Sequence, residues 1–183
     1  MAKSAITFSH MGIHCFDLEP MYDFYTDILD LTETDRGIVG PNLDLQIRFL
    51  SSDPDEHHQV VLVSGRDAAK DVTFLNQISF RVASLADLRE LHSRLAARGI
   101  SPGRVINHGM SWSMYFPDPE GNNIEAFVDS PWQIEQPVLD LLDLSKSDAE
   151  ILAETEQLVA GNPTLRTKAE YRQELAEKMG IEL

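Results

Sequence analysis

The sequence predicts an α+β protein made of two βαβββ modules, followed by a helical C-terminal extension. Two observations lead to this fold class. When the chain is shifted by 67 residues, residues 10–18 fall on residues 77–85 and His58 falls on Glu125. The hydrophobic pattern of each half also indicates one strand, one helix and three further strands. The offset exceeds the period of solenoid repeats, so it indicates a duplicated module rather than an array.

The first module begins with a strand near residues 6–16. Asp17 is the expected N-cap of the following helix, because apolar residues then recur at helical spacing from Leu18 to Leu29. Turn-forming residues separate three short strands, expected near residues 31–35, 43–50 and 57–63. Alternation along the first strand gives it two faces. Met11, Ile13 and Cys15 share one face, and His10, Gly12 and His14 share the other.

The second module repeats this pattern. Its first strand is expected over residues 74–82, and the sequence from Ser84 to Asp87 resembles the capping box that begins a helix. Leucines at helical spacing form the apolar stripe of that helix, which ends at Gly99. The three remaining strands are expected over residues 104–108, 111–116 and 122–128.

The composition changes near residue 132, so residues 1–132 are predicted to form the two-module domain and residues 133–183 an acidic helical extension. Helices are expected over residues 147–160, with Ser147 as the cap, and over residues 167–179. The extension carries many apolar side chains, which would form a large exposed patch if it were free. We expect these residues to pack on the domain or on a second subunit: Leu139, Leu141, Leu142, Leu144, Ile151, Leu152 and Leu158.

The charge balance disfavours two classes of partner. The 183 residues include 30 acidic and 15 basic ones, a net charge of −15, which disfavours nucleic acid and anionic membranes. A small anionic substrate in a locally positive pocket remains compatible with this charge. Cys15 is the single cysteine, so no internal disulfide can form. The N-terminus lacks the pattern of a secretory signal and no apolar run could span a membrane, so we expect a cytoplasmic protein.

His10 and Glu125 are the strongest candidates for metal binding, because the duplication brings them to related strands. Imidazole and carboxylate suit a divalent first-row metal, and two histidines with one carboxylate form the facial site of mononuclear iron(II) oxygenases. His58, His14 and Gln77 are the candidates for the third ligand. His14 lies about 13 Å from His10 along a strand, which is too far to share one ion without distortion.

Other polar residues have different expected roles. His57 and His58 are adjacent, so on a strand they face opposite sides, and the duplication register selects His58 for the site and leaves His57 in solvent. A histidine such as His108 can pass protons near neutral pH. The hydroxyl of Tyr115 can hydrogen-bond a substrate oxygen. Cys15 lies on the other face of its strand and is expected to be a small buried hydrophobe.

Five motifs together resemble a known superfamily. They are His10-Met-Gly-Ile-His-Cys-Phe-Asp-Leu-Glu19, Asp23-Phe-Tyr-Thr-Asp-Ile-Leu29, His57-His58-Gln-Val-Val-Leu62, Asn107-His108-Gly109 and Tyr115-Phe-Pro-Asp-Pro-Glu-Gly-Asn-Asn-Ile-Glu125. Over about residues 5–132 the chain resembles the vicinal-oxygen-chelate superfamily of glyoxalases, bleomycin-resistance proteins and type I extradiol dioxygenases. It is most similar to the small one-domain extradiol enzymes that cleave catechols such as biphenyl-2,3-diol.

The resemblance implies an open, U-shaped sheet around one cleft and a role for each matching residue. It implies iron ligands at His10 and Glu125, an acid–base residue at His58, and contacts of His108 and Tyr115 with substrate or oxygen. The implied cofactor is Fe(II), with Mn(II) or another divalent metal as alternatives. The implied partners are a small aromatic substrate, O2, and a second copy of the chain in a homodimer.

One position departs from the family pattern. The third iron ligand of these dioxygenases is a histidine that begins the fifth strand, and this chain has Gln77 there. A neutral amide oxygen is a weaker ligand than imidazole, although glyoxalases resemble this chain in using a glutamine at a pseudo-equivalent place.

Three functions therefore remain open. The favoured one is a metal-dependent extradiol dioxygenase in which His10, Gln77 and Glu125 bind the metal. The second is a glyoxalase-like isomerase or lyase that uses His58 as a fourth ligand of a redox-inert metal. The third is a metal-free protein that only binds a small molecule. Retention of the three residues assigned to catalysis favours the first: His58, His108 and Tyr115.

Overall fold

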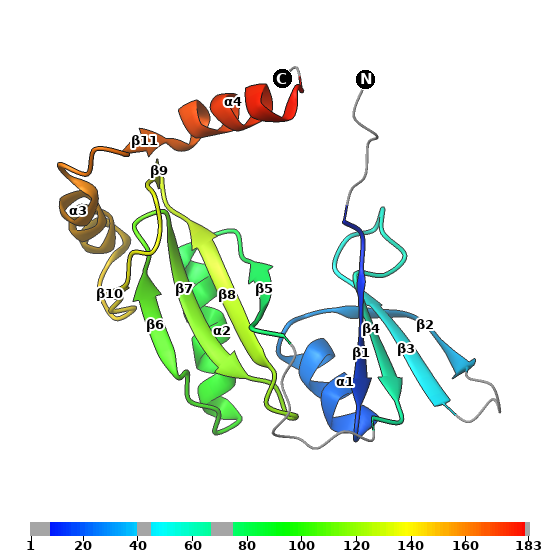
Figure 1. Cartoon of the computed structure of the whole chain (residues 1–183). Coiled ribbons are helices and arrows are strands. Elements are labelled where there is room, and N and C mark those ends of the chain that lie inside the picture. Colours follow the sequence, from blue (N-terminus) through cyan, green and yellow to red (C-terminus); the bar gives the residue numbers. More distant parts are fainter. Residues whose placement is uncertain (1–7, 40–44, 67–74, 182–183) are drawn as a thin grey trace. The chain divides into compact units, whose positions relative to one another are not determined.

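The structure, a computed structural model, describes residues 8–39, 45–66 and 75–181. These residues form two units, each built around its own β-sheet (Figure 1). The described part of residues 4–77 forms the first unit together with residues 117–123. The described parts of residues 78–116 and 124–183 form the second unit.

The first unit has the predicted βαβββ order. Its sheet has the strand order β1-β4-β3-β2, and β1 runs parallel to β4. Helix α1 covers one face of this sheet (Figure 1) and contributes Leu18, Met21, Phe24 and Tyr25 to the core. The elements are β1 (Met11–Cys15), α1 (Leu18–Asp27), β2 (Thr32–Val39), β3 (Leu45–Ser51) and β4 (Val60–Ser64).

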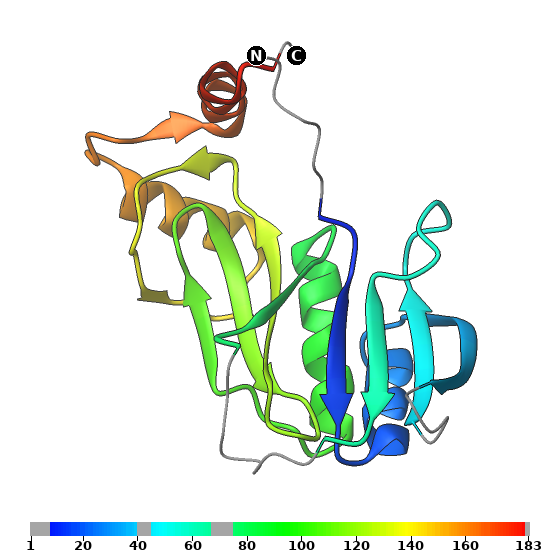
Figure 2. The same cartoon turned by 45° about the vertical axis from the view of Figure 1, so that its right-hand side comes forward.

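The second unit repeats this topology. Its sheet has the order β10-β6-β7-β8-β5, in which β5 runs parallel to β8 as β1 does to β4. Helix α2 lies along one face of the sheet (Figure 2). The leucines of its predicted apolar stripe are buried: Leu85, Leu88, Leu91 and Leu95. The α+β class and the paired βαβββ modules are therefore confirmed. The elements are β5 (Ile78–Arg81), α2 (Leu85–Ala97), β6 (Arg104–Asn107), β7 (Ser111–Pro117), β8 (Asn123–Asp129) and β10 (Asp140–Leu141).

The pairing register shows that the two modules do not share one constant offset. Met11 of β1 pairs with Val60, and Ile78 of β5 pairs with Ile124. The first strands of the modules are thus 67 residues apart (78 − 11), whereas the last strands are 64 apart (124 − 60). The connection from first to last strand is three residues longer in the first module, so a single offset misaligns the last strands.

Local sequence signals correctly predicted most of the helix caps. The hydroxyl of Ser84 accepts a hydrogen bond from the amide of Asp87 at the start of α2. Asp17 stands at the N-cap position of α1, but its side chain makes no capping hydrogen bond. The carboxylate of Glu120 accepts instead from the amides of Phe16 and Asp17, at 2.6 and 2.9 Å. The backbone amides at the start of α1 are therefore hydrogen-bonded by a residue about a hundred positions away in the chain.

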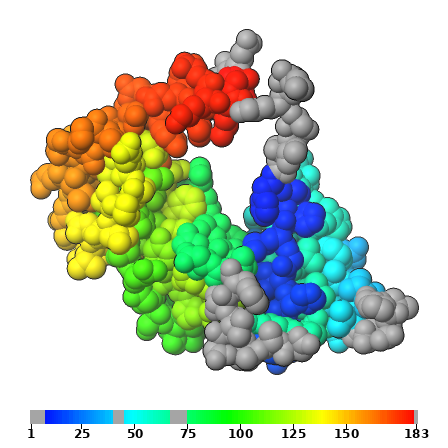
Figure 3. All heavy atoms as spheres, viewed as in Figure 1, coloured from blue at the N-terminus to red at the C-terminus, as the bar shows by residue number. Residues whose placement is uncertain are grey.

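The C-terminal extension is helical, as predicted. Capping boxes begin α3 at Ser147 and α4 at Thr167. In the space-filling view (Figure 3), its yellow and orange residues pack directly on the green residues of the second unit. Of the seven apolar residues expected to pack, Leu142 and Ile151 are buried, whereas Leu139, Leu141 and Leu152 are exposed. The elements are β9 (Trp132–Gln133), α3 (Asp148–Val159), β11 (Arg166–Thr167) and α4 (Lys168–Met179).

One buried hydroxyl ties α3 to the sheet. Thr155 Oγ1 accepts hydrogen bonds from Asn107 Nδ2 and Trp112 Nε1, both at 2.8 Å, and donates to the carbonyl of Ile151. The two lone pairs of this hydroxyl accept from two donors and its one proton is donated, so all of its hydrogen bonds are made without water. Within the described ranges, none of the helices has the length and apolar character needed to cross a bilayer.

Candidate functional site

Glu125 is a buried carboxylate on β8 whose two oxygens are both held by hydroxyl groups. Only 8% of the residue is exposed. Tyr115 on β7 donates to Oε1 at 2.6 Å, and Ser79 on β5 donates to Oε2 at 2.5 Å. Hydrogen bonds to an ionised carboxylate are short and strong, so strands on both sides of β8 fix the orientation of this group.

His108 extends this network. Its Nε2 lies 2.9 Å from the hydroxyl of Tyr115, and its Nδ1 lies 2.8 Å from the carbonyl oxygen of Val138. Tyr115 gives its single proton to Glu125, so it accepts from His108, and a carbonyl oxygen only accepts. Both contacts of the His108 ring are therefore contacts with acceptor atoms, and they fix the orientation of the ring beside Tyr115.

Burial and the Glu125 carboxylate keep Tyr115 protonated. Desolvation is the largest cause, followed by the hydrogen bond to Glu125 and its negative charge, and together they raise the pKa of Tyr115 to about 12. The phenol therefore remains a hydrogen-bond donor throughout the physiological range. The network His108–Tyr115–Glu125 thus combines a proton carrier, a neutral hydroxyl and a carboxylate.

The first unit brings His10 and His58 together. Their ring centroids are 4.2 Å apart, with the planes tilted by 57°. Burial is the largest cause that lowers the pKa of His58, and the neighbouring His10 and His57 rings add to the effect. The lowered pKa favours the neutral ring, which has a free lone pair for a proton or a metal.

The predicted placement of His57 and His58 on a strand is wrong. Both residues precede β4, which begins at Val60, and their Nδ1 atoms are 2.9 Å apart. They therefore do not face opposite sides of a sheet, although His57 is exposed as expected. The strand register makes Val61 the counterpart of Glu125, since the last strands differ by 64 residues. The closeness of His58 to His10 thus has a local cause in the loop before β4.

The remaining candidates lie at the ends and open faces of their strands. His10 immediately precedes β1 and is exposed, and His14 is exposed on the same strand, as the alternation predicted. Gln77 is exposed and immediately precedes β5. Cys15 is fully buried, and desolvation followed by the charge of Glu120 raises its pKa to about 12. The prediction that Cys15 is a small buried hydrophobe is confirmed.

The donor types fit a divalent first-row metal. His10 and His58 offer imidazole nitrogens, Gln77 an amide oxygen and Glu125 a carboxylate, which is a set that Fe(II), Mn(II) and Zn(II) accept. The hydroxyl partners of Glu125 resemble the outer hydrogen bonds that orient carboxylate ligands. Over the described ranges there is no cluster of three or more His, Cys, Asp or Glu side chains arranged to hold an ion.

Two residues near Glu125 and Tyr115 were not predicted from the sequence. Ser79 contacts Glu125, and the guanidinium of Arg104 lies 4.9 Å from the ring centroid of Tyr115. Ser79 stands two positions after Gln77, so strand alternation could have placed the two on one face. The position of Arg104 depends on its pairing with Tyr115 across β6 and β7, which no local pattern reveals.

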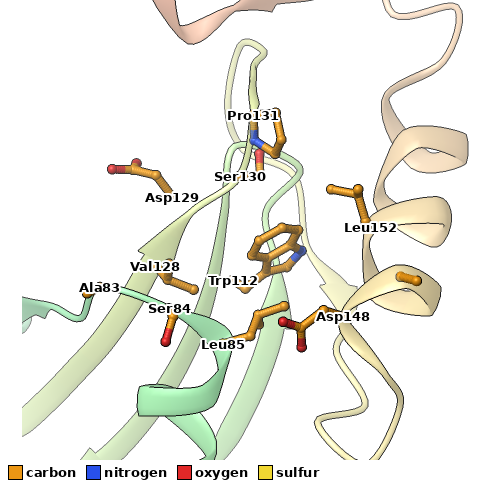
Figure 4. Close-up of a pocket in the computed structure, with 11 residues that line it drawn as sticks. Ala83, Ser84, Leu85, Trp112, Val128, Asp129, Ser130, Pro131, Asp148 and Leu152 are labelled. Atoms are coloured by element: carbon orange, nitrogen blue, oxygen red, sulfur yellow. The ribbon is translucent and has the colours of Figure 1, made fainter.

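A cavity of about 480 Å³ lies elsewhere in the second unit (Figure 4). Trp112, Leu85, Val128 and Leu152 line it, between the first turn of α2 and helix α3. Because successive side chains alternate along a strand, Trp112 and Val128 point to the face opposite Tyr115 and Glu125. This cavity is therefore separate from the hydrogen-bond network around Glu125.

Comparison with known proteins identifies the family. Residues 7–126 match the Glyoxalase/Bleomycin resistance protein/Dioxygenase superfamily. The match covers well over half of the chain, and the duplicated βαβββ topology agrees with it. The protein belongs to this superfamily.

Two curated relatives are dioxygenases from Rhodococcus globerulus. Biphenyl-2,3-diol 1,2-dioxygenase 2 is 28% identical over 127 residues, and biphenyl-2,3-diol 1,2-dioxygenase 3 is 33% identical over 127 residues. Each alignment covers 67% of this chain and 63% of the relative. The chain therefore matches less than two thirds of the length of these relatives.

Solved structures share the fold. A glyoxylase/bleomycin resistance protein/dioxygenase domain from Frankia sp. EAN1pec has a TM-score of 0.59 and 26% identity, over 69% of this chain and 100% of that one. The fosfomycin resistance protein FosX of Listeria monocytogenes, solved with Mn(II) and a sulfate ion, has a TM-score of 0.52 and 19% identity. That alignment covers 68% of this chain and 93% of FosX. These likenesses show a shared fold.

Proposed function

We propose that this protein is a metal-dependent extradiol dioxygenase that opens the ring of a catecholic substrate with O2. The hydrogen-bond network His108–Tyr115–Glu125 is the observation that carries the proposal, because it joins a proton carrier to a candidate metal ligand. A protein that only sequestered a small molecule would need neither of these contacts. The identity of 28–33% to biphenyl-2,3-diol dioxygenases supports the same reaction class.

In this proposal His10, Gln77 and Glu125 hold the metal ion, with Fe(II) as the expected ion. The bound ion would supply a common centre for the two catechol oxygens and O2. Tyr115 and Ser79 fix the Glu125 carboxylate and keep it from turning away from that centre. The second oxygen of a catechol must lose its proton for chelation, so a base is needed near the ligands.

His58 has the properties of that base. Its ring adjoins His10 and its lowered pKa keeps it neutral near pH 7, as proton acceptance requires. His108 and Tyr115 serve the later proton demand: the Tyr115 hydroxyl would turn from Glu125 to a substrate oxygen, donate its proton there and take a proton from Nε2 of His108. Proton removal and proton delivery are thus assigned to different modules.

Anaerobic purification followed by metal analysis and an assay in air tests the proposal. The protein should bind about one Fe(II) or Mn(II) per chain and convert 3-methylcatechol to a yellow ring-opened product with uptake of O2. Tight binding of the catechol without O2 uptake, at full metal loading, would contradict the dioxygenase proposal.

A glyoxalase-like isomerase or lyase is the second candidate. The contact between the His10 and His58 rings favours it, since both imidazoles could bind one redox-inert metal together with Gln77 and Glu125. This alternative requires His58 for metal binding, whereas the dioxygenase requires it for proton transfer. Metal content after His58 is replaced distinguishes the two.

We also propose a homodimer. Leu139 and Leu141 of the C-terminal extension are 67% and 84% exposed on the single chain, and neighbouring exposed apolar residues are typical of an interaction surface. Multi-angle light scattering should give twice the chain mass of 20.6 kDa. A monomer across the micromolar range would contradict this proposal.

A further inference from the structure

Arg104 lies on the same face of the second unit's sheet as Glu125. It is the first residue of β6 and stands directly opposite Tyr115 in the antiparallel pair with β7. Residues directly opposite in such a pair share a face, and Tyr115 reaches Glu125 by its hydroxyl. The guanidinium lies over the Tyr115 ring, with Cζ 4.9 Å from the centroid. A cation is therefore present next to the proposed site.

The Arg104 guanidinium forms no ion pair with a carboxylate within the described ranges. The chain has twice as many acidic as basic residues, 30 against 15, so an arginine has many potential partners. Other arginines of the same unit form ion pairs with acidic residues: Arg81 pairs with Asp129 at 2.8 Å, and Arg89 pairs with Asp148 at 2.6 Å. Arg104 is exposed and, among the described residues, is held only over an aromatic ring. Its five donors are available to bind a ligand.

Apolar surface adjoins Arg104 on this face. Ile106 follows two positions later on β6 and stands opposite Ser113 of β7 and Leu141 of β10. Leu141 is 84% exposed. Toward the other end of β6 this face thus becomes aliphatic, with Ile106 buried and Leu141 exposed.

We propose that Arg104 is a specificity-determining residue that binds a carboxylate on the side chain of the substrate. This inference rests on the proposed dioxygenase function and narrows its substrate to catechols with an anionic substituent. The planar guanidinium presents paired N–H groups that match the two oxygens of a carboxylate. Arg104 forms no ion pair among the described residues, so its charge is available to attract such a group.

Anaerobic calorimetry with two probes tests this role. The probes are a catechol with a 2-carboxyethyl group at ring position 3 and its methyl ester, which has a similar shape without the charge. The metal-loaded wild-type protein should bind the acid about 10-fold more tightly than the ester, the lower end for a hydrogen bond to a charged group. The Arg104→Gln variant should bind both alike, and Arg104→Lys should recover part of the preference.

Arg81→Gln is the matched control. Arg81 also lies near an aromatic ring, 5.2 Å from the centroid of Phe127, but Asp129 already neutralises it. The control should keep the wild-type preference for the acid. A wild-type protein without preference, an Arg104→Gln variant that keeps it, or an equal loss in Arg81→Gln would each overturn the assignment.

Ring cleavage of both probes, measured in parallel, separates this inference from the proposed function. If neither probe is cleaved while the acid still binds more tightly through Arg104, the dioxygenase proposal fails and the carboxylate subsite stands. If both are cleaved with equal kcat/KM, the dioxygenase proposal stands and the subsite fails.

Discussion

The hydroxyl of Tyr115 donates a 2.6 Å hydrogen bond to Oε1 of Glu125. The two residues are ten positions apart and come from neighbouring strands, β7 and β8, of the second module. The bond ties the orientation of a candidate metal ligand to a phenol that also contacts His108. A single substitution at Tyr115 therefore affects the carboxylate and the proton path together.

Replacing Tyr115 by Phe should lower kcat for 3-methylcatechol by about 100-fold, a typical loss when one hydrogen-bond donor is removed from a reacting centre. It should also lower the free energy of unfolding by about 1–3 kcal/mol, because a buried carboxylate oxygen loses its donor. Steady-state kinetics and urea unfolding measure the two effects. Tyr25→Phe is the control: Tyr25 donates to Asp118 at 3.3 Å, so its loss should affect stability and not kcat. A Tyr115→Phe protein with wild-type kcat would contradict the assigned role.

Replacing His58 by Gln should lower turnover of 3-methylcatechol by about 10²–10⁴-fold, the usual contribution of a general acid–base residue. Metal content should remain that of the wild type, since the proposed ligands are His10, Gln77 and Glu125. Plasma emission spectrometry of anaerobically purified protein measures the metal. His92→Gln on α2 is the control and should change neither quantity. Loss of the metal in His58→Gln would instead favour the glyoxalase-like function.

Replacing Gln77 by His should strengthen binding of Fe(II) by about 10-fold or more, because imidazole is a better ligand for first-row metals than an amide oxygen. Competition with a coloured chelator under argon measures the affinity. Asn76→His is the matched control, since it adds an imidazole at the position next to Gln77 and should leave the affinity at the wild-type value. Equal affinities in the wild type and in Gln77→His would show that Gln77 takes no part in metal binding.

Local patterns were sufficient to predict the two modules. Helices α1 and α2 follow from apolar residues at helical spacing, and Ser147 marks the start of α3 as the predicted cap. The buried and exposed faces of β1 follow from alternation. These features depend on residues within a few positions of each other, so the sequence contains them directly.

Contacts between distant residues were not predictable in the same way. The contact of His58 with His10 depends on where β4 begins, and the strand prediction began it three residues too early. The pairing of Arg104 with Tyr115 depends on the register of β6 against β7. Glu120 reaches the amides before α1 from the turn between β7 and β8. Such contacts are set by strand register and loop length, which hydrophobic periodicity does not encode.

The buried ion pair between Glu120 and Arg66 should be important for the stability of the first unit. Glu120 Oε2 lies 3.2 Å from Arg66 Nη1, and only 2% of the Glu120 side chain is exposed. Glu120→Gln keeps an oxygen for the amides of Phe16 and Asp17 but removes the charge. Breaking a buried pair in this way should cost about 3 kcal/mol in urea unfolding. Glu90→Gln breaks an exposed pair with Arg94 and should cost less than about 0.5 kcal/mol; equal costs would contradict the importance of burial.

Thr155 makes α3 an integral part of the second unit, and a pair of substitutions tests this. Thr155→Val keeps the shape but leaves the buried donors of Asn107 and Trp112 without their acceptor, so it should cost about 2–5 kcal/mol. Thr155→Ser keeps the hydroxyl and removes one methyl group, so it should cost only about 1 kcal/mol. Chemical unfolding followed by Trp fluorescence suits the measurement, because Trp112 itself reports on the contact. If the Val and Ser variants were equally stable, the hydrogen bonds would contribute nothing beyond packing, and α3 would be held by its apolar side chains alone.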